Sequence, residues 1–351
     1  MECSGSYALE GMVSDRRGFR PGYLIVEDGR AVEVGGGECP VRPDRRGIVL
    51  MDTVNGHTHC ADYGLRVPPG MSLQELVAPP DGLKHRYLRE APDTEISSNM
   101  SRFARDSRAS GAVTFVDFRE GGARGCRMLR ESAPEAVILG RPVSPEFDPE
   151  EIDDILSVAD GIGISSVSDM DPGYIEAVAD AVRERRMVFA IHVSERVRED
   201  IDFVLSLDPA FVVHMCEATD SDILKCAEAE VPIVVCPTSN RYFGKVPPIA
   251  RAEALGADLA IGTDNGMIRS PDMVAEALEF ARTAEAQGGD PETVWSALWK
   301  LSGKILNQHR NILNYNGTDV LSVIPTEDFD ALSALGGKPE AVALDENTKR
   351  L

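Results

Sequence analysis

The sequence lacks the patterns that would mark a secreted, disulfide-linked or membrane-spanning protein. Its seven cysteines are scattered and form no Cys-x-x-Cys pair, so we expect reduced thiols rather than a disulfide framework or a cysteine zinc site. Its apolar runs, such as residues 233–236, are far shorter than the ~20 residues that cross a bilayer. Residues 1–6 show no basic stretch before an apolar core, so no secretory signal is expected. These absences predict a cytoplasmic protein.

Basic residues are also few in comparison with acidic ones. The chain has 36 Lys and Arg residues against 58 Asp and Glu residues, which gives a formal net charge of −22. Such a surface repels nucleic-acid phosphates and anionic lipids, so we expect neither nucleic acid nor a membrane as a partner. The expected partner is a small-molecule substrate, and a homo-oligomer stays open. The charge indicates nothing about the fold, because an acidic surface can simply keep a protein soluble.

The rest of the composition suits a large folded core, since 43% of the 351 residues are hydrophobic. Apolar runs bounded by turn residues predict eight strands that are buried on both faces. They are residues 48–54, 112–118, 136–139, 161–167, 187–193, 211–215, 232–236 and 258–262. Between them, residues 174–185, 222–229 and 271–284 carry apolar side chains at helical spacing. This alternation predicts an α/β fold, a TIM-like (β/α)8 barrel.

The two ends of the chain differ from its middle. Residues 23–26 and 31–34 flank the turn Glu27-Asp28-Gly29, which is a hairpin signal. After a helical stretch at 291–306, residues 320–324 and 341–344 are again β-like. A lone hairpin is marginal in water, so we expect the two ends to pair outside the barrel. We predict a small β-sandwich side domain from residues 1–46 and 312–351, and a barrel from residues 47–311.

Only six histidines occur, and four of them fall at or just after the ends of predicted strands. His57 and His59 follow the first strand two residues apart, so both imidazoles can face one side. His192, His214 and Asp264 stand at the ends of the fifth, sixth and eighth strands. In a barrel, polar residues at the C-terminal strand ends form the active site. Three neutral imidazoles and one carboxylate suit Zn²⁺, although Fe²⁺ and Mn²⁺ accept similar sets.

Each of these residues has an ordinary structural explanation when it is taken alone. A single histidine on an apolar strand is usually part of the core, and an aspartate near glycine or asparagine is usually part of a turn. The coincidence of four histidines and one aspartate at strand ends favours a metal site instead. The sequence therefore predicts a metal-dependent enzyme with its site at one rim of the barrel.

The motifs around these residues resemble those of the amidohydrolase superfamily. The branch that they resemble holds guanine, cytosine and S-adenosylhomocysteine/methylthioadenosine deaminases and the triazine hydrolases, and the resemblance covers nearly the whole chain. It rests on Gly56-His57-Thr58-His59, His192-Val193-Ser194-Glu195, His214, Cys236-Pro237-Thr238-Ser239-Asn240 and Gly262-Thr263-Asp264. The chain departs from the branch at Val235, where deaminases often have a histidine, and this weakens any transfer of a particular substrate.

The resemblance implies that His57, His59, His192 and Asp264 bind one metal ion together with a water molecule. Glu195 would be the proton shuttle, His214 would hold the water or a polar group of the substrate, and Asp264 would also act in catalysis. A metal lowers the pKa of its water to about 7, and a nearby carboxylate can move the proton. Binuclear relatives use a carboxylated lysine after the fourth strand, but residues 161–168 contain no lysine, so one ion is expected.

We predict that the enzyme deaminates an amino-substituted N-heterocycle, such as a purine or a pyrimidine, with release of ammonia. One alternative is hydrolysis of another C–N bond, such as that of a cyclic amide. A second is a non-catalytic barrel scaffold, although such proteins usually lose ligands and this chain keeps all those expected. The loops that select the substrate carry no readable code.

Residues 61–90 form a long segment that could cover the site as a lid. Cations in this segment and after later strands could bind an anionic substrate group, but for any one of them a solvated surface charge is the favoured explanation. They are Arg66, Lys84, His85, Arg86, Arg241 and Arg269. Asn240 is a better candidate for the pocket, because its segment follows a strand end directly.

Overall fold

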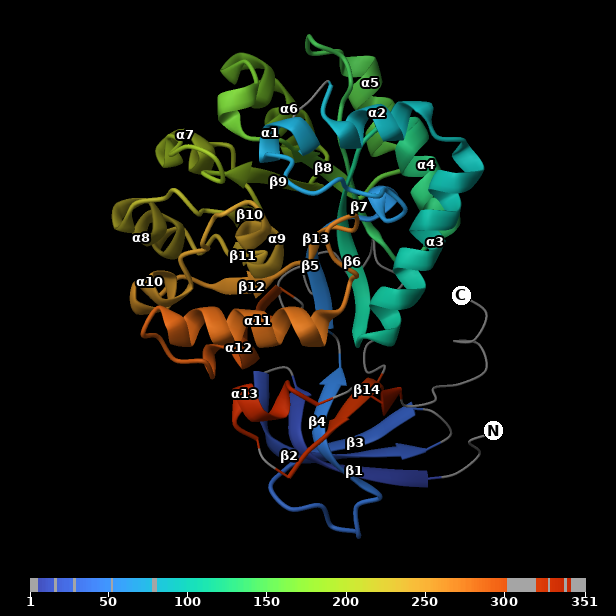
Figure 1. The fold of residues 1–351 in the computed structure, drawn as a ribbon, viewed down its shortest axis with the longest axis vertical. Coiled ribbons are helices and arrows are strands. Elements are labelled where there is room, and N and C mark those ends of the chain that lie inside the picture. The colour runs from blue at the N-terminus through green and yellow to red at the C-terminus, as the bar shows by residue number, and fades with distance from the viewer. Residues whose placement is uncertain are drawn as a thin grey trace.

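The computed structural model describes residues 6–15, 18–27, 30–51, 53–77, 81–301, 320–327, 329–337 and 340–341. Its strands form a nine-stranded sheet and a separate six-stranded sheet. Figure 1 shows the larger sheet surrounded by helices, with the smaller sheet below. Helices α11 (Met273–Ala286) and α12 (Thr293–Leu301) lie between the two sheets, whereas α1 (Leu73–Val77) and α2 (Leu83–Glu90) lie at the opposite end of the molecule.

The smaller sheet contains strands from both ends of the described chain, in the order β15-β14-β4-β1-β2-β3. These strands are β1 (Ser6–Asp15), β2 (Gly18–Glu27), β3 (Arg30–Gly36), β4 (Arg45–Met51), β14 (Val320–Pro325) and β15 (Glu340–Ala341). The predicted hairpin is confirmed, because β2 and β3 pair in antiparallel fashion. Strand β14 pairs with β4, so the late residues extend the early sheet (Figure 1). The described residues form one sheet here, not the two facing sheets of the predicted sandwich.

The larger sheet is parallel throughout and carries the second to eighth predicted strands in sequence order. They are β5 (Thr53–His59), β6 (Ala112–Arg119), β7 (Val137–Gly140), β8 (Gly161–Ile164), β9 (Val188–Val193), β10 (Phe211–His214), β11 (Ile233–Val235), β12 (Leu259–Ile261) and β13 (Asp264–Asn265). The predicted first strand, 48–54, is wrong: residues 48–51 belong to β4 of the smaller sheet, and the barrel-type sheet begins with β5. The apolar run marks a different strand from the one that carries the histidines. Strand β4 crosses the predicted boundary between residues 46 and 47. The predicted division into two domains stays a prediction.

The sheet curls as a TIM-like fold does, but no single strand closes it. Strand β12 pairs with β11, whereas β13, three residues further on, pairs with β5 at the other edge. Gly262 lies between the two pieces, and a Cβ atom added there would lie 2.7 Å from the backbone nitrogen of His57. The missing side chain thus lets this last segment pass close to β5. The TIM-like expectation is confirmed in part, as a curled sheet with an interrupted closing strand.

The inside of the curled sheet is filled by side chains from its own strands. Val54, Val116, Ala190, Val213 and Ala260 belong to one buried cluster there, and each has at most 3% of its surface exposed. The barrel is therefore a packed core rather than a pore. Polar groups can gather only at the ends of the strands, outside this apolar interior.

Helices cover the outer face of the larger sheet. Besides those already given, they are α3 (Asp93–Ala109), α4 (Gly122–Ser132), α5 (Pro149–Leu156), α6 (Pro172–Glu184), α7 (Ile201–Ser206), α8 (Asp220–Glu228), α9 (Pro237–Tyr242) and α10 (Ile249–Ala254), with short 3₁₀ turns at Cys60–Asp62 and Val167–Asp169. The short helix α13 (Ala331–Ala334) lies beside the smaller sheet instead (Figure 1). Helix α6 is representative: the Asp171 carboxylate accepts a hydrogen bond from Tyr174 N, and the predicted apolar stripe, including Ile175 and Val178, is buried. Within the described part of the chain, no helix combines the length and apolarity needed to cross a membrane.

The close approach of β14 to β4 at Gly47 gives a test of the smaller sheet. A Cβ atom added at Gly47 would lie 2.1 Å from the carbonyl oxygen of Ile324. This oxygen belongs to the backbone, so it cannot move away by rotation of a side chain. Gly47→Ala should therefore lower the free energy of unfolding by about 1–3 kcal/mol, as overpacking does. Gly36→Ala is the matched control, since no atom lies within 4 Å of its added Cβ. Equal denaturant midpoints for the two variants would contradict the close contact between β4 and β14.

Candidate active site

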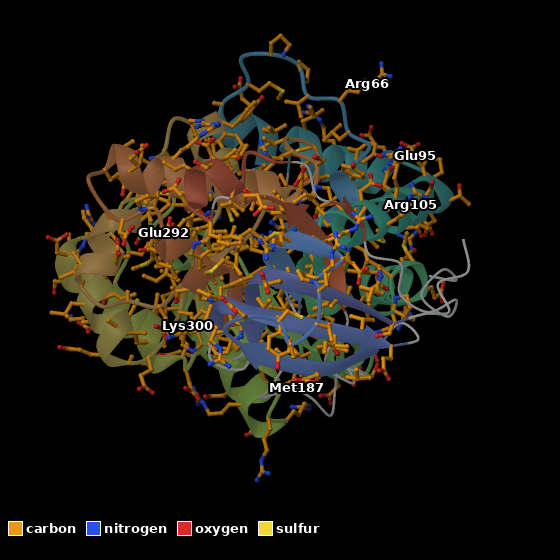
Figure 2. All side chains as sticks on the ribbon, turned by 90° about the horizontal axis from the view of Figure 1, so that it is seen from below. Arg66, Glu95, Arg105, Met187, Glu292 and Lys300 are labelled. Atoms are coloured by element: carbon orange, nitrogen blue, oxygen red, sulfur yellow. The ribbon has the colours of Figure 1, made fainter. Side chains whose placement is uncertain are left out.

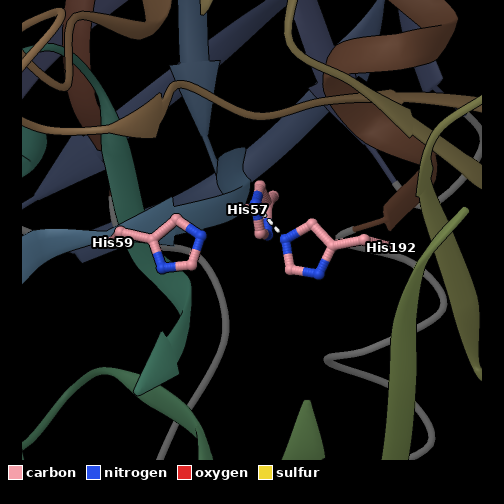
Figure 3. Close-up of side chains that lie close together, drawn as sticks. All are labelled: His57, His59 and His192. Atoms are coloured by element: carbon pink, nitrogen blue, oxygen red, sulfur yellow. Dashed lines mark hydrogen bonds between the residues drawn. The ribbon is translucent and has the colours of Figure 1, made fainter. Parts of the chain in front are cut away.

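Three imidazoles and one carboxylate meet where the strands of the larger sheet end. His57 and His59 come from β5 and His192 from β9, and Figure 3 shows their rings turned toward one another. The Nε2 atom of His57 lies 3.2 Å from Nε2 of His192 and 3.3 Å from Oδ1 of Asp264. The Nε2 atom of His59 lies 3.6 Å from the same Asp264 oxygen. The structure thus brings together the four residues predicted as ligands.

These four atoms have the spacing of a metal's ligands. Tetrahedral ligands about 2.0–2.1 Å from Zn²⁺ are about 3.3 Å apart, which is close to the separations found here. A ligand histidine must be neutral. Burial lowers the pKa of His57 to about 4, although Asp264 opposes this shift, and burial also lowers the pKa of His192 well below its usual value. Burial alone would raise the pKa of Asp264, but its hydrogen bond with His57 and the nearby imidazoles hold that pKa well below its usual value. The donor set therefore fits a divalent metal ion.

Neighbouring groups orient two of the histidines toward the cluster, whereas Nδ1 of His57 has no hydrogen-bond partner among the described residues. The Nδ1 atom of His59 lies 3.2 Å from the carbonyl oxygen of Phe118 and 3.0 Å from a carboxylate oxygen of Glu120. The Nδ1 atom of His192 lies 2.9 Å from the carbonyl oxygen of Ile164. These contacts occupy Nδ1 and leave Nε2 for the cluster, as is usual for metal-binding histidines.

Asp264 has one oxygen engaged by a neighbour and the other facing the cluster. Its Oδ2 atom accepts a hydrogen bond from the hydroxyl of Ser239, and its Oδ1 atom faces His57 and His59. Ser239 and Asn240 both belong to α9, directly after β11. The segment that the sequence singled out at this strand end therefore supports the cluster.

His214 lies beside the four and is oriented differently. Its Nδ1 atom lies 3.0 Å from the amide nitrogen of Asn240, which can only donate, so Nδ1 accepts and Nε2 carries the hydrogen. That Nε2 atom lies 3.8 Å from a carboxylate oxygen of Glu195. In this arrangement His214 offers a hydrogen-bond donor to the cavity, although a ring nitrogen of His214 also lies close enough to His57 and Asp264 for these three residues to hold a metal ion.

Glu195 faces the cluster from the loop after β9. Burial, and then the negative charge of Asp264, raise its pKa to about 8, so the group can both hold and release a proton near neutral pH. The alternative that it caps the following helix does not hold, because Asp200 is the N-cap of α7 and accepts hydrogen bonds from the first helical turn. Its partly buried carboxyl is thus left for chemistry.

Three residues at the site have a left-handed backbone that non-glycine residues rarely adopt. The φ angles are 49° at Ser194, 79° at His214 and 59° at Asp264. Each of these residues lies at or beside the end of a barrel strand. Such strain clusters at functional sites, where it points side chains in directions that a regular strand would not allow.

A cavity of about 300 Å³ opens onto the cluster, and we call it the site cavity. His59, His192, Glu195, His214 and Asp264 line it, together with Leu73, Gln74, Val77, Lys84 and His85 from the predicted lid segment. Of the other predicted cations, Arg66 projects away from the body of the molecule (Figure 2), Arg241 pairs with Glu279, and Arg269 pairs with Glu276. Arg86 is exposed on α2.

Two charged residues at the site were missed from the sequence. Glu120 follows β6 and contacts His59, and it also pairs with Lys84 at 2.7 Å. Arg141 follows β7 and lines the site cavity. Both come directly after a barrel strand, so the rule that found His192 and His214 could have found them too. Charged residues are common after strands, however, and only the histidines were scarce enough to stand out.

The chain is similar to archaeal and bacterial hydrolases. No family model matches it. A relative from Archaeoglobus fulgidus, provisionally named an aminohydrolase, is 35% identical over 275 residues, which cover 77% of this chain and 78% of that protein. The fold is similar to that of an adenosine deaminase from Xanthomonas campestris with bound zinc, with a TM-score of 0.66 at 16% identity over 97% of this chain and 95% of the other.

A variant of a triazine hydrolase has a TM-score of 0.70 at 14% identity, over 97% of this chain and 93% of the other. Sequence identity at this level shows the fold alone, but the archaeal relative is close enough to show the family. The fold is thus shared with a deaminase and a triazine hydrolase, and the chain itself belongs to the amidohydrolases, as a metal-dependent hydrolase of carbon–nitrogen bonds.

Proposed function

We propose that the protein binds one zinc ion per chain and deaminates an amino-substituted N-heterocycle. The observation that carries the proposal is Glu195, a partly buried carboxyl with a raised pKa that faces the His–Asp cluster within one cavity. A deamination needs such a group, because a proton must leave the attacking water and another must reach the leaving nitrogen. The similarity to an adenosine deaminase and a triazine hydrolase supports an amino-substituted ring as the substrate class.

The residues take distinct roles in this proposal. His57, His59, His192 and Asp264 would hold the ion, which supplies a water molecule whose pKa is lowered to about 7. Glu195 accepts a proton from this attacking water and delivers it to the ring nitrogen beside the reacting carbon. His214 donates a hydrogen bond from Nε2 to the substrate or the water, and Asp264 passes the water's second proton to the leaving amino group. The ring gains an oxygen at that carbon and ammonia leaves.

An ammonia assay over a panel of amino-substituted heterocycles tests the reaction. Deamination releases one ammonia for each substrate consumed, whereas opening of a cyclic amide consumes substrate without releasing ammonia. Ring opening without ammonia would replace the proposed reaction with the second kind of C–N hydrolysis. Purified protein without stoichiometric metal and without turnover would indicate a scaffold.

The residues around the site cavity support the proposal of one ion per chain. Strand β8 and Ser165 after it offer no lysine, and Lys84 already pairs with Glu120. Elemental analysis after dialysis should give one equivalent of metal, and His192→Ala should lower it by removing a ligand. His85→Ala is the control that should keep the metal, because its Nε2 atom lies 3.0 Å from the Val77 carbonyl instead. Two equivalents in the wild type, or unchanged metal in His192→Ala, would contradict the ligand set.

Glu195→Gln separates proton transfer from metal binding. An amide has nearly the same shape as the carboxyl but cannot accept the water's proton, so kcat should fall by about 10²–10⁴-fold. Metal content and melting temperature should match the wild type, since Glu195 is neither a ligand nor a helix cap here. Glu217→Gln is the control for a nearby carboxylate, which pairs with Lys245 instead, and it should keep its kcat. A near-normal kcat in Glu195→Gln would remove Glu195 from the mechanism.

A further inference from the structure

Most charged groups that line the site cavity have a partner of opposite charge. Lys84 pairs with Glu120 at 2.7 Å, and Arg196 pairs with Asp169 at 2.8 Å. Asp264 belongs to the metal cluster, and Glu195 is the proposed proton shuttle. Arg141 is different, because no ion pair joins it to any carboxylate in the part of the chain that the structure describes. Burial lowers the pKa of Arg141, but a guanidinium stays charged in proteins.

Arg141 is held in a fixed position on the rim. It follows β7, its backbone nitrogen donates to the carbonyl oxygen of Arg119 at 2.8 Å, and its own carbonyl oxygen accepts from the nitrogen of Gly122 at 3.3 Å. Its side chain donates from Nη2 to the hydroxyl of Ser165 at 3.1 Å. A guanidinium has five N–H donors, so several are left for a ligand. Arg141 is only partly exposed, and the nearby carboxylates of Glu120 and Asp169 attract it without forming an ion pair, so an anion that enters the cavity would gain a direct partner.

A second cavity of about 680 Å³ lies next to the site cavity, and Arg141 and His85 line both. The second cavity is lined by four arginines but only two carboxylates. They are Arg89, Arg119, Arg124 and Arg141, with Asp93 and Glu120. The side chain of Arg119 is buried, and its Nη1 atom, 3.6 Å from Glu120, has no hydrogen-bond partner. Arg124 pairs with Asp93, Arg89 with Asp81 and Arg119 with Glu120, so Arg141 is the one arginine of this lining for which the described residues show no ion pair.

The backbone adds to this positive potential. Helix α4 begins at Gly122 beside the second cavity, which Gly121 and Gly125 line, and its N-terminal residue has no side-chain cap. The first N–H groups of a helix attract anions. The φ angles of Gly121 and Gly122 are 89° and 58°, which only glycine adopts readily. Because neither residue has a side chain, the backbone of this turn can come close to a ligand.

We propose that the substrate carries an anionic group, a carboxylate or a phosphate, and that Arg141 binds it at the boundary between the two cavities. The inference rests on the proposed function, since it names a feature of the molecule that the same site takes. The heterocycle occupies the site cavity beside Glu195, and its charged substituent extends past Arg141 toward Arg119. Both anions suit the planar fork of a guanidinium.

Calorimetric titration of zinc-loaded protein with matched ligand pairs tests this proposal. Adenosine and adenosine 5′-monophosphate form the phosphate pair, and 4-aminopyrimidine and 4-aminopyrimidine-5-carboxylate form the carboxylate pair. A charge-assisted hydrogen bond corresponds to about a tenfold to hundredfold gain in affinity. We expect the anionic member of at least one pair to bind about tenfold or more tightly than its neutral partner, and the pair that shows this identifies the anion. If neither pair shows it, the proposal is overturned.

Arg141→Met keeps the length of the side chain but removes its charge. The preference for the anionic ligand should disappear, while affinity for the neutral ligand changes less than about twofold. Arg196→Gln is the matched control, because it removes another guanidinium of the same cavity that already has a carboxylate partner. It should keep the preference. An equal loss for both members of a pair in Arg141→Met, or loss of the preference in Arg196→Gln, would assign the effect elsewhere and overturn the proposal.

A conservative variant covers the case in which Arg141→Met does not fold. Arg141→Lys keeps the charge but cannot bind in a bidentate manner, so the anion preference should fall at least about threefold. An unchanged preference in this variant would contradict the assignment to Arg141.

Ammonia measured in the same samples separates the two proposals. Anion binding that depends on Arg141 without any ammonia release leaves the inference standing and removes deamination. Ammonia release from neutral rings, with no advantage for the anionic ones, does the opposite.

Discussion

The site depends on a contact between the first and last strands of the larger sheet. The Asn55 side chain accepts a hydrogen bond from the backbone nitrogen of Thr263 at 2.9 Å and donates one to its hydroxyl at 2.8 Å, and both residues are buried. Leaving such buried groups unpaired would be costly, so the contact fixes the register of the last segment. Because Thr263 precedes Asp264, the same contact sets the carboxylate beside His57. A ligand more than two hundred residues away along the chain is thereby placed to within a hydrogen-bond length.

Around this contact, the orientation of the cluster is linked to the segment that covers the cavity. Glu120 contacts His59 from one side, and Lys84 on α2 contacts Glu120 from the other. Burial alone would raise the pKa of Glu120, but Lys84, His59 and Arg119 hold it well below its usual value, so it stays an anion. Lys84 also donates to Asn265, the residue after Asp264. The covering segment thus contacts the neighbours of two proposed ligands, so its position and their orientation are coupled.

The sequence predicted the ends of most barrel strands well. It misplaced β5, the strand that carries two of the proposed metal ligands. Most barrel strands are continuous apolar runs, and hydrophobicity finds them. Strand β5 is fully buried, yet it contains Asn55, His57 and His59, so hydrophobicity placed the first strand on the apolar residues of β4 instead. The division of the last strand at Gly262 was also invisible, because it depends on how closely that strand passes His57. Glu120 and Arg141 were missed since only three-dimensional neighbours distinguish them from surface charges.

The same strands that carry the site also stabilise the fold, and the two tasks fall on different parts of each strand. Below the rim, Val213 of β10 and Ala260 of β12 lie in the closed apolar interior. At the rim, His214 and Asp264 adopt positive φ, which costs of order 1–3 kcal/mol for a non-glycine residue. Side chains along a strand point alternately to its two faces, and a residue with positive φ interrupts this alternation. Its side chain can then point toward the site cavity instead of the barrel interior or the surrounding helices. The packed interior is what allows the rim to tolerate this strain.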